Sequence, residues 1–107
     1  MALAAAVQGA RHTAQQITWT DDAGNAEDLT GATLTGYIKQ SGAVRPIDGA
    51  LDIVTAAAGV FTWTYGADDV ATVGECNVQF VATFSDGLQD KTLISVWHVY
   101  NALDDEI

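Results

Sequence analysis

The sequence predicts an all-β domain, and three observations carry this prediction. Short segments in which apolar and polar residues alternate follow one another along most of the 107 residues. Turn-forming combinations of Gly, Asp and Asn separate these segments, at the spacing expected of an all-β domain. The periodicity of an amphipathic helix of useful length is absent from the sequence. The length fits a single domain.

The first strand is expected near residues 13–20, where Ile17 and Trp19 alternate with polar neighbours. An acidic turn over residues 21–25 follows it. Gly and Asn tolerate a positive φ in such a turn, and Asp side chains bond nearby backbone N–H groups.

A second strand is expected over residues 32–39, with Gly36 marking a bulge or a point of close packing. The segment 43–47 contains Pro46, which favours an edge strand because proline cannot donate a hydrogen bond to a neighbouring strand. A further strand follows around residues 51–55.

The middle of the chain predicts a corner of small residues over 56–59 and then an aromatic strand over 60–65. Phe61, Trp63 and Tyr65 would share one face of that strand. The following residues, 67–71, are expected to form one helical turn. In this interpretation its acidic residues, Asp68 and Asp69, lie at the helix start, where the helix dipole favours them.

The clearest amphipathic strand is expected over residues 77–84, where alternate residues are apolar. The Asp86–Gly87 pair after it is typical of a tight hairpin. The last strand is predicted from about Thr92 to Tyr100.

About seven antiparallel strands therefore predict a two-sheet β-sandwich of immunoglobulin-like type, with a small barrel as the alternative. We expect a flexible N-terminal arm over residues 1–12, the sandwich over 13–101 and an acidic C-terminal tail over 102–107. The arm is rich in alanine, which would also allow it to become ordered only against a neighbouring molecule.

The final strand is apolar on both faces, whereas a solvated sandwich strand normally has one polar face. One face carries Leu93, Trp97 and Val99, and the other carries Ile94, Val96 and Tyr100. Either the N-terminal arm covers the outer face of this strand, or the strand forms a subunit interface. We name as candidate interface residues Leu93, Trp97, Val99 and Tyr100.

Composition excludes several classes of partner. The chain has 14 acidic and 4 basic residues and a formal net charge of −10. A polyanion is repelled by this charge, so nucleic acid binding and attachment to an anionic membrane are disfavoured. Only 17% of residues are charged and 49% are apolar, which is too apolar a composition for a disordered chain. The apolar start lacks a basic region, which makes it a poor signal peptide.

No set of residues points to catalysis or to a cofactor. Cys76 is the single cysteine and is expected to be a buried thiol. The two histidines, His12 and His98, occur in the arm and in the last strand, without a recognisable partner. The acidic segment 21–28 fails the EF-hand pattern, and an ordinary acidic turn is favoured over a looser calcium site. Tryptophans that could stack on sugars are more plausible in a core or an interface.

The order of several turn motifs resembles the N-terminal immunoglobulin-like domain of phage baseplate upper proteins and related small tail and virion proteins. The motifs are Asp-Leu-Thr-Gly-Ala-Thr at 28–33, Ile-Asp-Gly at 47–49, Ala-Ala-Gly-Val at 57–60 and Phe-Ser-Asp-Gly at 84–87. The resemblance extends over about residues 13–99. At a position where family members often carry tyrosine, this chain has Cys76.

The resemblance implies a non-enzymatic structural protein of the phage virion, in a baseplate, a tail or a capsid decoration. Its partners would be other virion proteins and copies of itself, reached by protein–protein packing and by strand addition. We expect no cofactor, metal or small-molecule substrate, and a virion location after synthesis in the host cytoplasm. The alternative is a β-sandwich module that binds a host surface or a polysaccharide.

Overall fold

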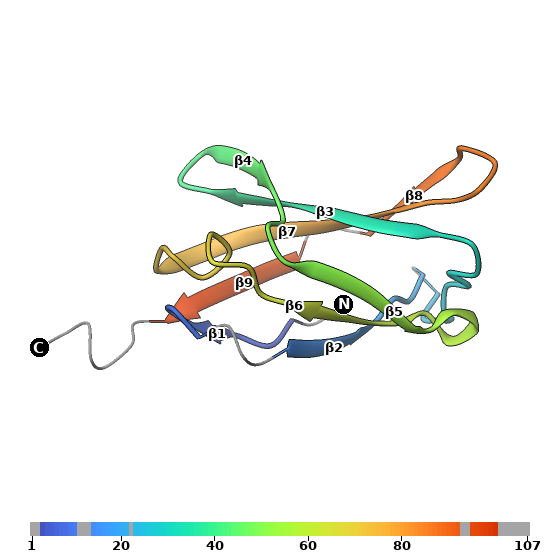
Figure 1. Ribbon diagram of the computed structural model, residues 1–107, viewed down its shortest axis with the longest axis horizontal. Helices are drawn as coiled ribbons and strands as arrows, with labels where there is room; N and C mark the ends of the chain where they lie inside the picture. Colours follow the sequence, from blue (N-terminus) through green and yellow to red (C-terminus); the bar gives the residue numbers. More distant parts are fainter. Residues whose placement is uncertain (1–2, 11–13, 22, 93–94, 101–107) are drawn as a thin grey trace, which may run out of the picture.

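A computed structural model describes residues 3–10, 14–21, 23–92 and 95–100 (Figure 1). The strands form two sheets packed face to face, so the predicted all-β sandwich is confirmed. Helical structure in the described residues is limited to one 3₁₀ turn, η1 (Ala56–Ala58). None of the described helical structure is long and apolar enough to cross a membrane.

The larger sheet has the strand order β1-β9-β7-β3-β4, and β8 pairs with the far end of β7. Its strands are β1 (Ala6–Val7), β3 (Thr33–Gln40), β4 (Ala43–Pro46), β7 (Gly74–Thr83), β8 (Gln89–Lys91) and β9 (Ser95–Tyr100). The smaller sheet has the order β2-β6-β5, formed by β2 (Ala14–Thr18), β5 (Ala50–Thr55) and β6 (Val60–Thr64). All pairings are antiparallel except that between β1 and β9, which is parallel.

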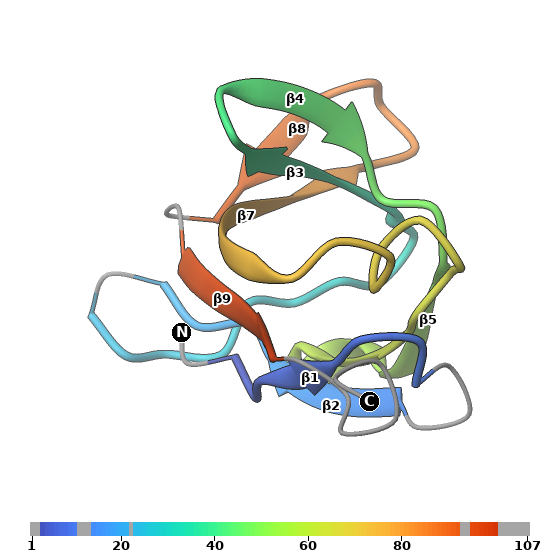
Figure 2. The same ribbon diagram turned by 90° about the vertical axis from the view of Figure 1, so that its left-hand side faces the viewer.

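The chain crosses between the sheets after β1, β2, β4 and β6, which gives the sandwich its two layers (Figures 1 and 2). The described residues contain nine strands, against the seven expected. The two additional strands, β1 and β8, have two and three residues. Segments this short contain too few residues for a recognisable alternation.

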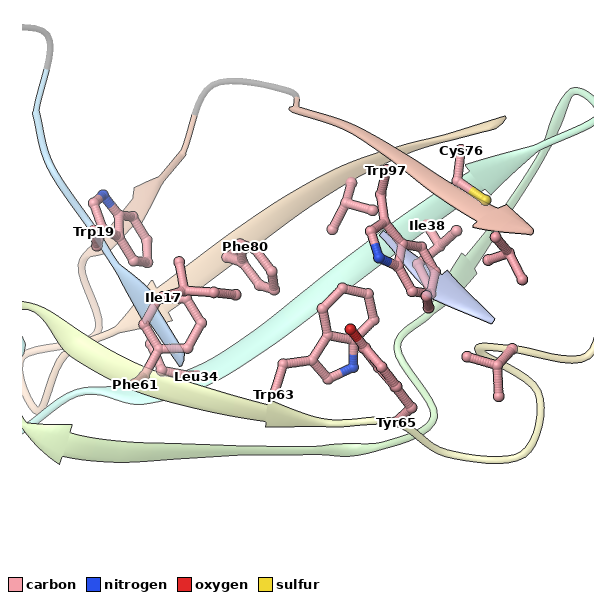
Figure 3. Close-up of a cluster of buried hydrophobic side chains, with 14 of the residues drawn as sticks. Ile17, Trp19, Leu34, Ile38, Phe61, Trp63, Tyr65, Cys76, Phe80 and Trp97 are labelled. Atoms are coloured by element: carbon pink, nitrogen blue, oxygen red, sulfur yellow. The ribbon is translucent and has the colours of Figure 1, made fainter. Parts of the chain in front are cut away.

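The core consists of inward-facing residues from both sheets (Figure 3). Phe61 and Trp63 of β6 are fully buried, as the alternation in that strand predicts. They pack edge-to-face against Phe80 of β7, with ring centroids 5.1 and 5.8 Å away. The ring of Trp97 of β9 is tilted against that of Trp63, with the two centroids 4.5 Å apart. Edge-to-face aromatic contacts of this kind add stability beyond the burial of their area.

Within the expected N-terminal arm over residues 1–12, Ala6–Val7 form a short strand of the larger sheet. β1 extends the larger sheet, with Ala6 opposite Val99 and Val7 opposite Tyr100. The segment therefore lies at the edge of β9 and does not cover the outer face of that strand (Figure 2). Residues 1–2 and 11–12 of the expected arm, and the tail at 102–107, lie outside the described residues.

The segment after β6 also differs from expectation, because residues 67–70 form turns and not a helical turn. Asp69 is completely buried, whereas a residue at a helix start would be solvated. Its carboxylate accepts hydrogen bonds from the backbone N–H groups of Asp48, Gly49 and Gly66, at 2.9, 2.9 and 2.8 Å. The buried carboxylate thus joins the β4–β5 connection to the β6–β7 connection.

Two further groups complete the surroundings of Asp69. The indole N–H of Trp63 donates to the carboxylate at 3.3 Å, and the guanidinium of Arg45 lies 3.4 Å from it. Glycine is required at Gly49 and Gly66, because a Cβ at either position would overlap backbone of the facing connection. This joint holds β4, the edge strand that contains Arg45 and Pro46, against the rest of the sandwich.

Candidate interaction surface

The outer face of the larger sheet is the broadest surface that the fold leaves open. The residues that face outward alternate with core residues along β9, β7 and β3, and β4 adds mostly exposed residues at the edge of the sheet. Strand register places Val96, Asn77, Lys39 and Val44 in one row across these four strands. Gln79, Tyr37 and Pro46 form the adjacent row.

Apolar side chains gather at both edges of this outer face. At one edge, Tyr37 lies opposite Pro46, and Val44 lies two residues away on the same side of β4. Tyr37 is 47% exposed and Val44 is 64% exposed. We call these three residues the β3–β4 patch. Large apolar side chains left this open on a sheet face are typical of a surface that another molecule covers.

A second group occupies the opposite edge. Val7 lies opposite Tyr100, and Val96 faces outward on the same strand as Tyr100. We call these three residues the β1–β9 patch. His98 lies between Val96 and Tyr100 on β9. Its ring stacks on the ring of Tyr100, with the two centroids 4.2 Å apart. Val96 is 57% exposed and Tyr100 is 54% exposed.

The residues between the two patches are polar. Glu75, Asn77 and Gln79 of β7 face outward beside Lys39 of β3. A shallow groove of about 210 Å³ lies there, and Tyr37 and Val44 form one of its walls. The surface therefore combines apolar edges with a centre that can form hydrogen bonds, as protein interfaces commonly do.

A second hollow, of about 250 Å³, lies where β3 meets the connection from β4 to β5. Gly36 forms part of it and confirms the expected point of close packing. The side chain of Ile47 lies over Gly36, where a Cβ would come within 2.5 Å of it. The backbone N–H of Ile47 also donates to the Gly36 carbonyl at 2.9 Å. Gly36 therefore lets the chain leave β4 close to β3.

The structure places two of the four candidate interface residues in the core. Trp97 and Val99 point inward and are 1% and 0% exposed, so a partner cannot reach their side chains in the folded domain. Tyr100 points outward and belongs to the β1–β9 patch. Leu93 lies outside the described residues. Val96 of the same strand is not one of the four candidates, but its side chain is exposed.

Among the described residues, no group of three or more His, Cys, Asp or Glu side chains could hold a metal ion. Cys76 is buried, as expected, and burial raises the pKa of its thiol. A thiol with a raised pKa is a poor nucleophile. His98 stacks on Tyr100, and His12 lies outside the described residues.

In the acidic turn over residues 21–25, the Asp21 carboxylate bonds to backbone N–H groups of the same turn, as expected. Asp21 accepts hydrogen bonds from the backbone N–H groups of Ala23 and Asn25, both at 2.9 Å. Asp28 accepts from the hydroxyl of Thr30 at 2.6 Å and from its backbone N–H, and these bonds lower the pKa of Asp28. Asp22 lies outside the described residues.

Glu27 is paired with another acid across the sandwich. A side-chain hydrogen bond with Asp90 raises the pKa of Glu27 to about 6, with smaller contributions from desolvation and from the neighbouring charges of Asp21 and Asp28. Asp90 belongs to β8, which the sequence did not predict as a strand. This pair therefore had no recognisable signal in the sequence.

The three tryptophans that could have formed a sugar-stacking platform are all in the core. Trp19, Trp63 and Trp97 are 3%, 0% and 1% exposed. The aromatic side chains open to solvent on the outer face are those of Tyr37 and Tyr100. A carbohydrate site on this face would depend on these tyrosines.

Comparison with known proteins adds no relative: no family model and no curated protein matches the chain.

Proposed function

We propose that this protein is a non-enzymatic structural component that works by packing the outer face of its larger sheet against other proteins. The observation that carries the proposal is the exposure of large apolar side chains on that face, in the β3–β4 and β1–β9 patches. Tyrosine is enriched at the centres of protein interfaces, and each patch contains one. The phage virion setting, in a baseplate, tail or capsid decoration, rests on the family resemblance of the sequence.

The strand connectivity supports an immunoglobulin-like assignment within this proposal. Four crossings between the sheets put β2, β5 and β6 in one layer and β1, β3, β4, β7, β8 and β9 in the other. Immunoglobulin-like sandwiches distribute their antiparallel strands over two sheets in this manner.

The distribution of charge is compatible with assembly. Most acids in the described residues are exposed and occupy turns or strand ends, and Asp69 is the buried exception. The outer face itself carries Lys39 and Glu75, whose charges cancel. A net charge of −10 around a nearly neutral sheet face would keep separate copies soluble until a partner covers the face.

The experiment compares association of the wild-type protein with that of outer-face variants. Light scattering over a concentration series measures self-association, and co-sedimentation with purified particles measures binding to virion proteins. The variant Tyr37→Ser/Val44→Ser removes apolar surface from the β3–β4 patch. Truncating a central interface side chain costs about 1–2 kcal/mol, so we expect binding to weaken roughly tenfold or more.

Val54→Ser is the matched control, because Val54 is 55% exposed but belongs to β5 of the smaller sheet. It should leave association unchanged. A wild-type protein that stays monomeric and does not sediment with particles would count against the structural proposal.

A glycan-binding module is the second candidate, and one observation favours it. The groove of about 210 Å³ places the ring of Tyr37 beside the amide side chains of Asn77 and Gln79. An aromatic ring and amide groups are the combination that stacks on and hydrogen-bonds to a sugar. Saturable glycan binding that Tyr37→Ala abolishes, by a protein that does not associate with other proteins, would favour this candidate.

A further inference from the structure

The N-terminal segment, residues 3–10, occupies a seat that the two sheets form together. The backbone N–H of Ala4 donates to Oε1 of Gln15 at 2.9 Å. The carbonyl of Ala4 accepts from Nε2 of Gln15 and from the indole N–H of Trp97, both at 3.0 Å. Gln15 belongs to β2 of the smaller sheet and Trp97 to β9 of the larger sheet. The backbone of one residue is therefore held from both layers of the sandwich.

The polar groups of the seat are buried and connected to one another. Gln15 is 9% exposed, and its Nε2 also donates to the hydroxyl of Tyr65 at 2.8 Å. Burial raises the pKa of Tyr65, which keeps its hydroxyl protonated. If the segment left, the amide of Gln15 and the indole N–H of Trp97 would each lose a partner. Buried polar groups without partners are costly, so the seat must be refilled.

The seat selects an extended chain with small side chains. The seat binds the backbone of Ala4 and not its side chain. A chain of any sequence could offer that backbone. Ala6, opposite Val99, is 4% exposed in the core, where a larger residue would overfill the space. The sequence Ala4-Ala5-Ala6 meets these requirements.

The remaining anchors of the segment also come from distant parts of the chain. The backbone N–H of Gln8 donates to the Tyr100 carbonyl at 2.9 Å, and that of Gly9 donates to the Val70 carbonyl at 3.0 Å. The side chain of Gln8 donates to the Ala71 carbonyl at 2.9 Å. A segment from another copy of this chain could make every one of these contacts.

The connection from this segment to β2 is short. Only three residues, 11–13, separate Ala10 from Ala14, which limits the reach to about 14 Å for a fully extended chain. A short connection invites the exchange of a segment between copies when folding back within one chain strains it. Release takes the buried Ala6 and the partly buried Leu3, which packs against the core, out of the sandwich, while the other residues of 3–10 lie mostly exposed.

We propose that two copies of this protein exchange residues 3–10, so that the seat of each copy binds Ala4–Ala6 of the other. Exchange replaces each contact within a chain by the same contact between chains, which makes it a low-cost route to dimers. β1 of one copy then pairs with β9 of its partner copy, in the register already described. This inference does not depend on the β3–β4 patch, because segments can be exchanged whatever binds that patch.

The experiment traps the exchanged pairing with a disulfide in the full chain. Val7 and Tyr100 are opposite each other on β1 and β9, and both are exposed. Neighbouring strands lie about 5 Å apart, which a disulfide can bridge. One chain carries Val7→Cys and a second carries Tyr100→Cys. The two are unfolded together, refolded together in a redox buffer, and analysed by mass spectrometry for a link between positions 7 and 100.

In the exchanged dimer, the new cysteine of one chain lies against that of the other. The control mixes the Val7→Cys chain with a Leu88→Cys chain, whose new cysteine lies at a hairpin position that is 69% exposed. We expect the yield of heterodimers linked between positions 7 and 100 to exceed severalfold the yield of linked heterodimers in this control. The double variant Val7→Cys/Tyr100→Cys in one chain tests the register, and it should form its disulfide readily.

Two results would overturn the inference. Linked heterodimers no more abundant than in the Leu88 control, with an efficient disulfide in the double variant, would show that the segment stays in its own chain. A double variant that forms no disulfide within a chain or between chains would show that the seat is wrong.

Discussion

The hydrogen bonds at Asp69 predict a large effect of Asp69→Asn, a change that preserves the size of the side chain. The carboxylate accepts from three backbone N–H groups and one indole N–H, and Arg45 lies beside it. An asparagine side chain has one oxygen and one NH₂ group. Whichever way the amide is oriented, its NH₂ group faces at least one buried N–H group that has no other acceptor in this joint.

The magnitude follows from the groups left without partners. One oxygen accepts from Asp48 and contacts Arg45, while the other accepts from Gly49, Gly66 and Trp63. The less costly orientation places the NH₂ group on the first side, where one buried donor loses its acceptor at about 1–3 kcal/mol. The remaining bonds lose their charge assistance, and a hydrogen bond to a charged group contributes about 1.5–3 kcal/mol against about 0.5–1.5 kcal/mol for a neutral one. We therefore expect a loss of at least about 3 kcal/mol.

Denaturant unfolding measures this loss directly. A change of 3 kcal/mol corresponds to a fall in Tm of about 12–24 °C for a domain of this size. Asp68→Asn is the matched control, because it makes the same chemical change at the adjacent, exposed residue. Surface substitutions of that kind stay within about 0.5 kcal/mol. If Asp69→Asn and Asp68→Asn unfold at the same denaturant concentration, the proposed role of the buried joint is refuted.

Three further predictions concern the same joint and the acidic pair. Arg45→Met should cost only about 1 kcal/mol in denaturant unfolding, because Arg45 is 30% exposed and the backbone donors still hold Asp69; a loss as large as that of Asp69→Asn would contradict this ranking. Gly49→Ala should cost at least about 2 kcal/mol, because its Cβ would overlap a carbonyl oxygen of β6; a neutral result would show that the two connections lie further apart. Glu27 has a pKa raised to about 6, so the folded state binds this proton more tightly than the unfolded state and stability from this group falls as pH rises from about 4.5 to 6. Glu27→Gln should therefore raise the free energy of unfolding at pH 7–8 by under about 1 kcal/mol, because Asp90 is exposed. A variant with unchanged Tm above pH 6 would argue against the pair.

The sequence was sufficient to predict the strands that alternate over five or more residues. β3, β6 and β7 begin and end within about three residues of their expected bounds. Edge strand β4 was recognisable from Pro46 alone. These signals are local, because a strand with one face in the core must place apolar residues at every second position.

The contacts that the sequence did not reveal connect distant segments. Asp69 looked like a residue at a helix start, because its acidic neighbour and the alanines around it favour that local structure. Its true partners, Asp48 and Gly49, lie about twenty residues earlier. Two glycines in facing turns were the available signal, since close approach of two backbones requires residues without a Cβ.

The candidate interface residues illustrate a second limit. Both faces of β9 are apolar, so alternation alone could not distinguish the face that packs on the core. Pairing decides it: Trp97 lies opposite Cys76, a core residue of β7, and Val96 lies opposite the exposed Asn77. Val96 and Tyr100 are therefore exposed on the outer face, whereas Trp97 and Val99 belong to the core.

Hydroxyl-radical footprinting of the protein, free and in its assembled state, tests the proposed role of the outer face most directly. Tyr37 and Tyr100 are about half exposed on that face, whereas Tyr65 is 6% exposed in the core. Assembly through the outer face predicts that Tyr37 and Tyr100 lose most of their labelling in the assembled state, while Tyr65 stays unlabelled throughout and Leu88 stays labelled. Equal labelling of Tyr37 and Tyr100 in both states would contradict it.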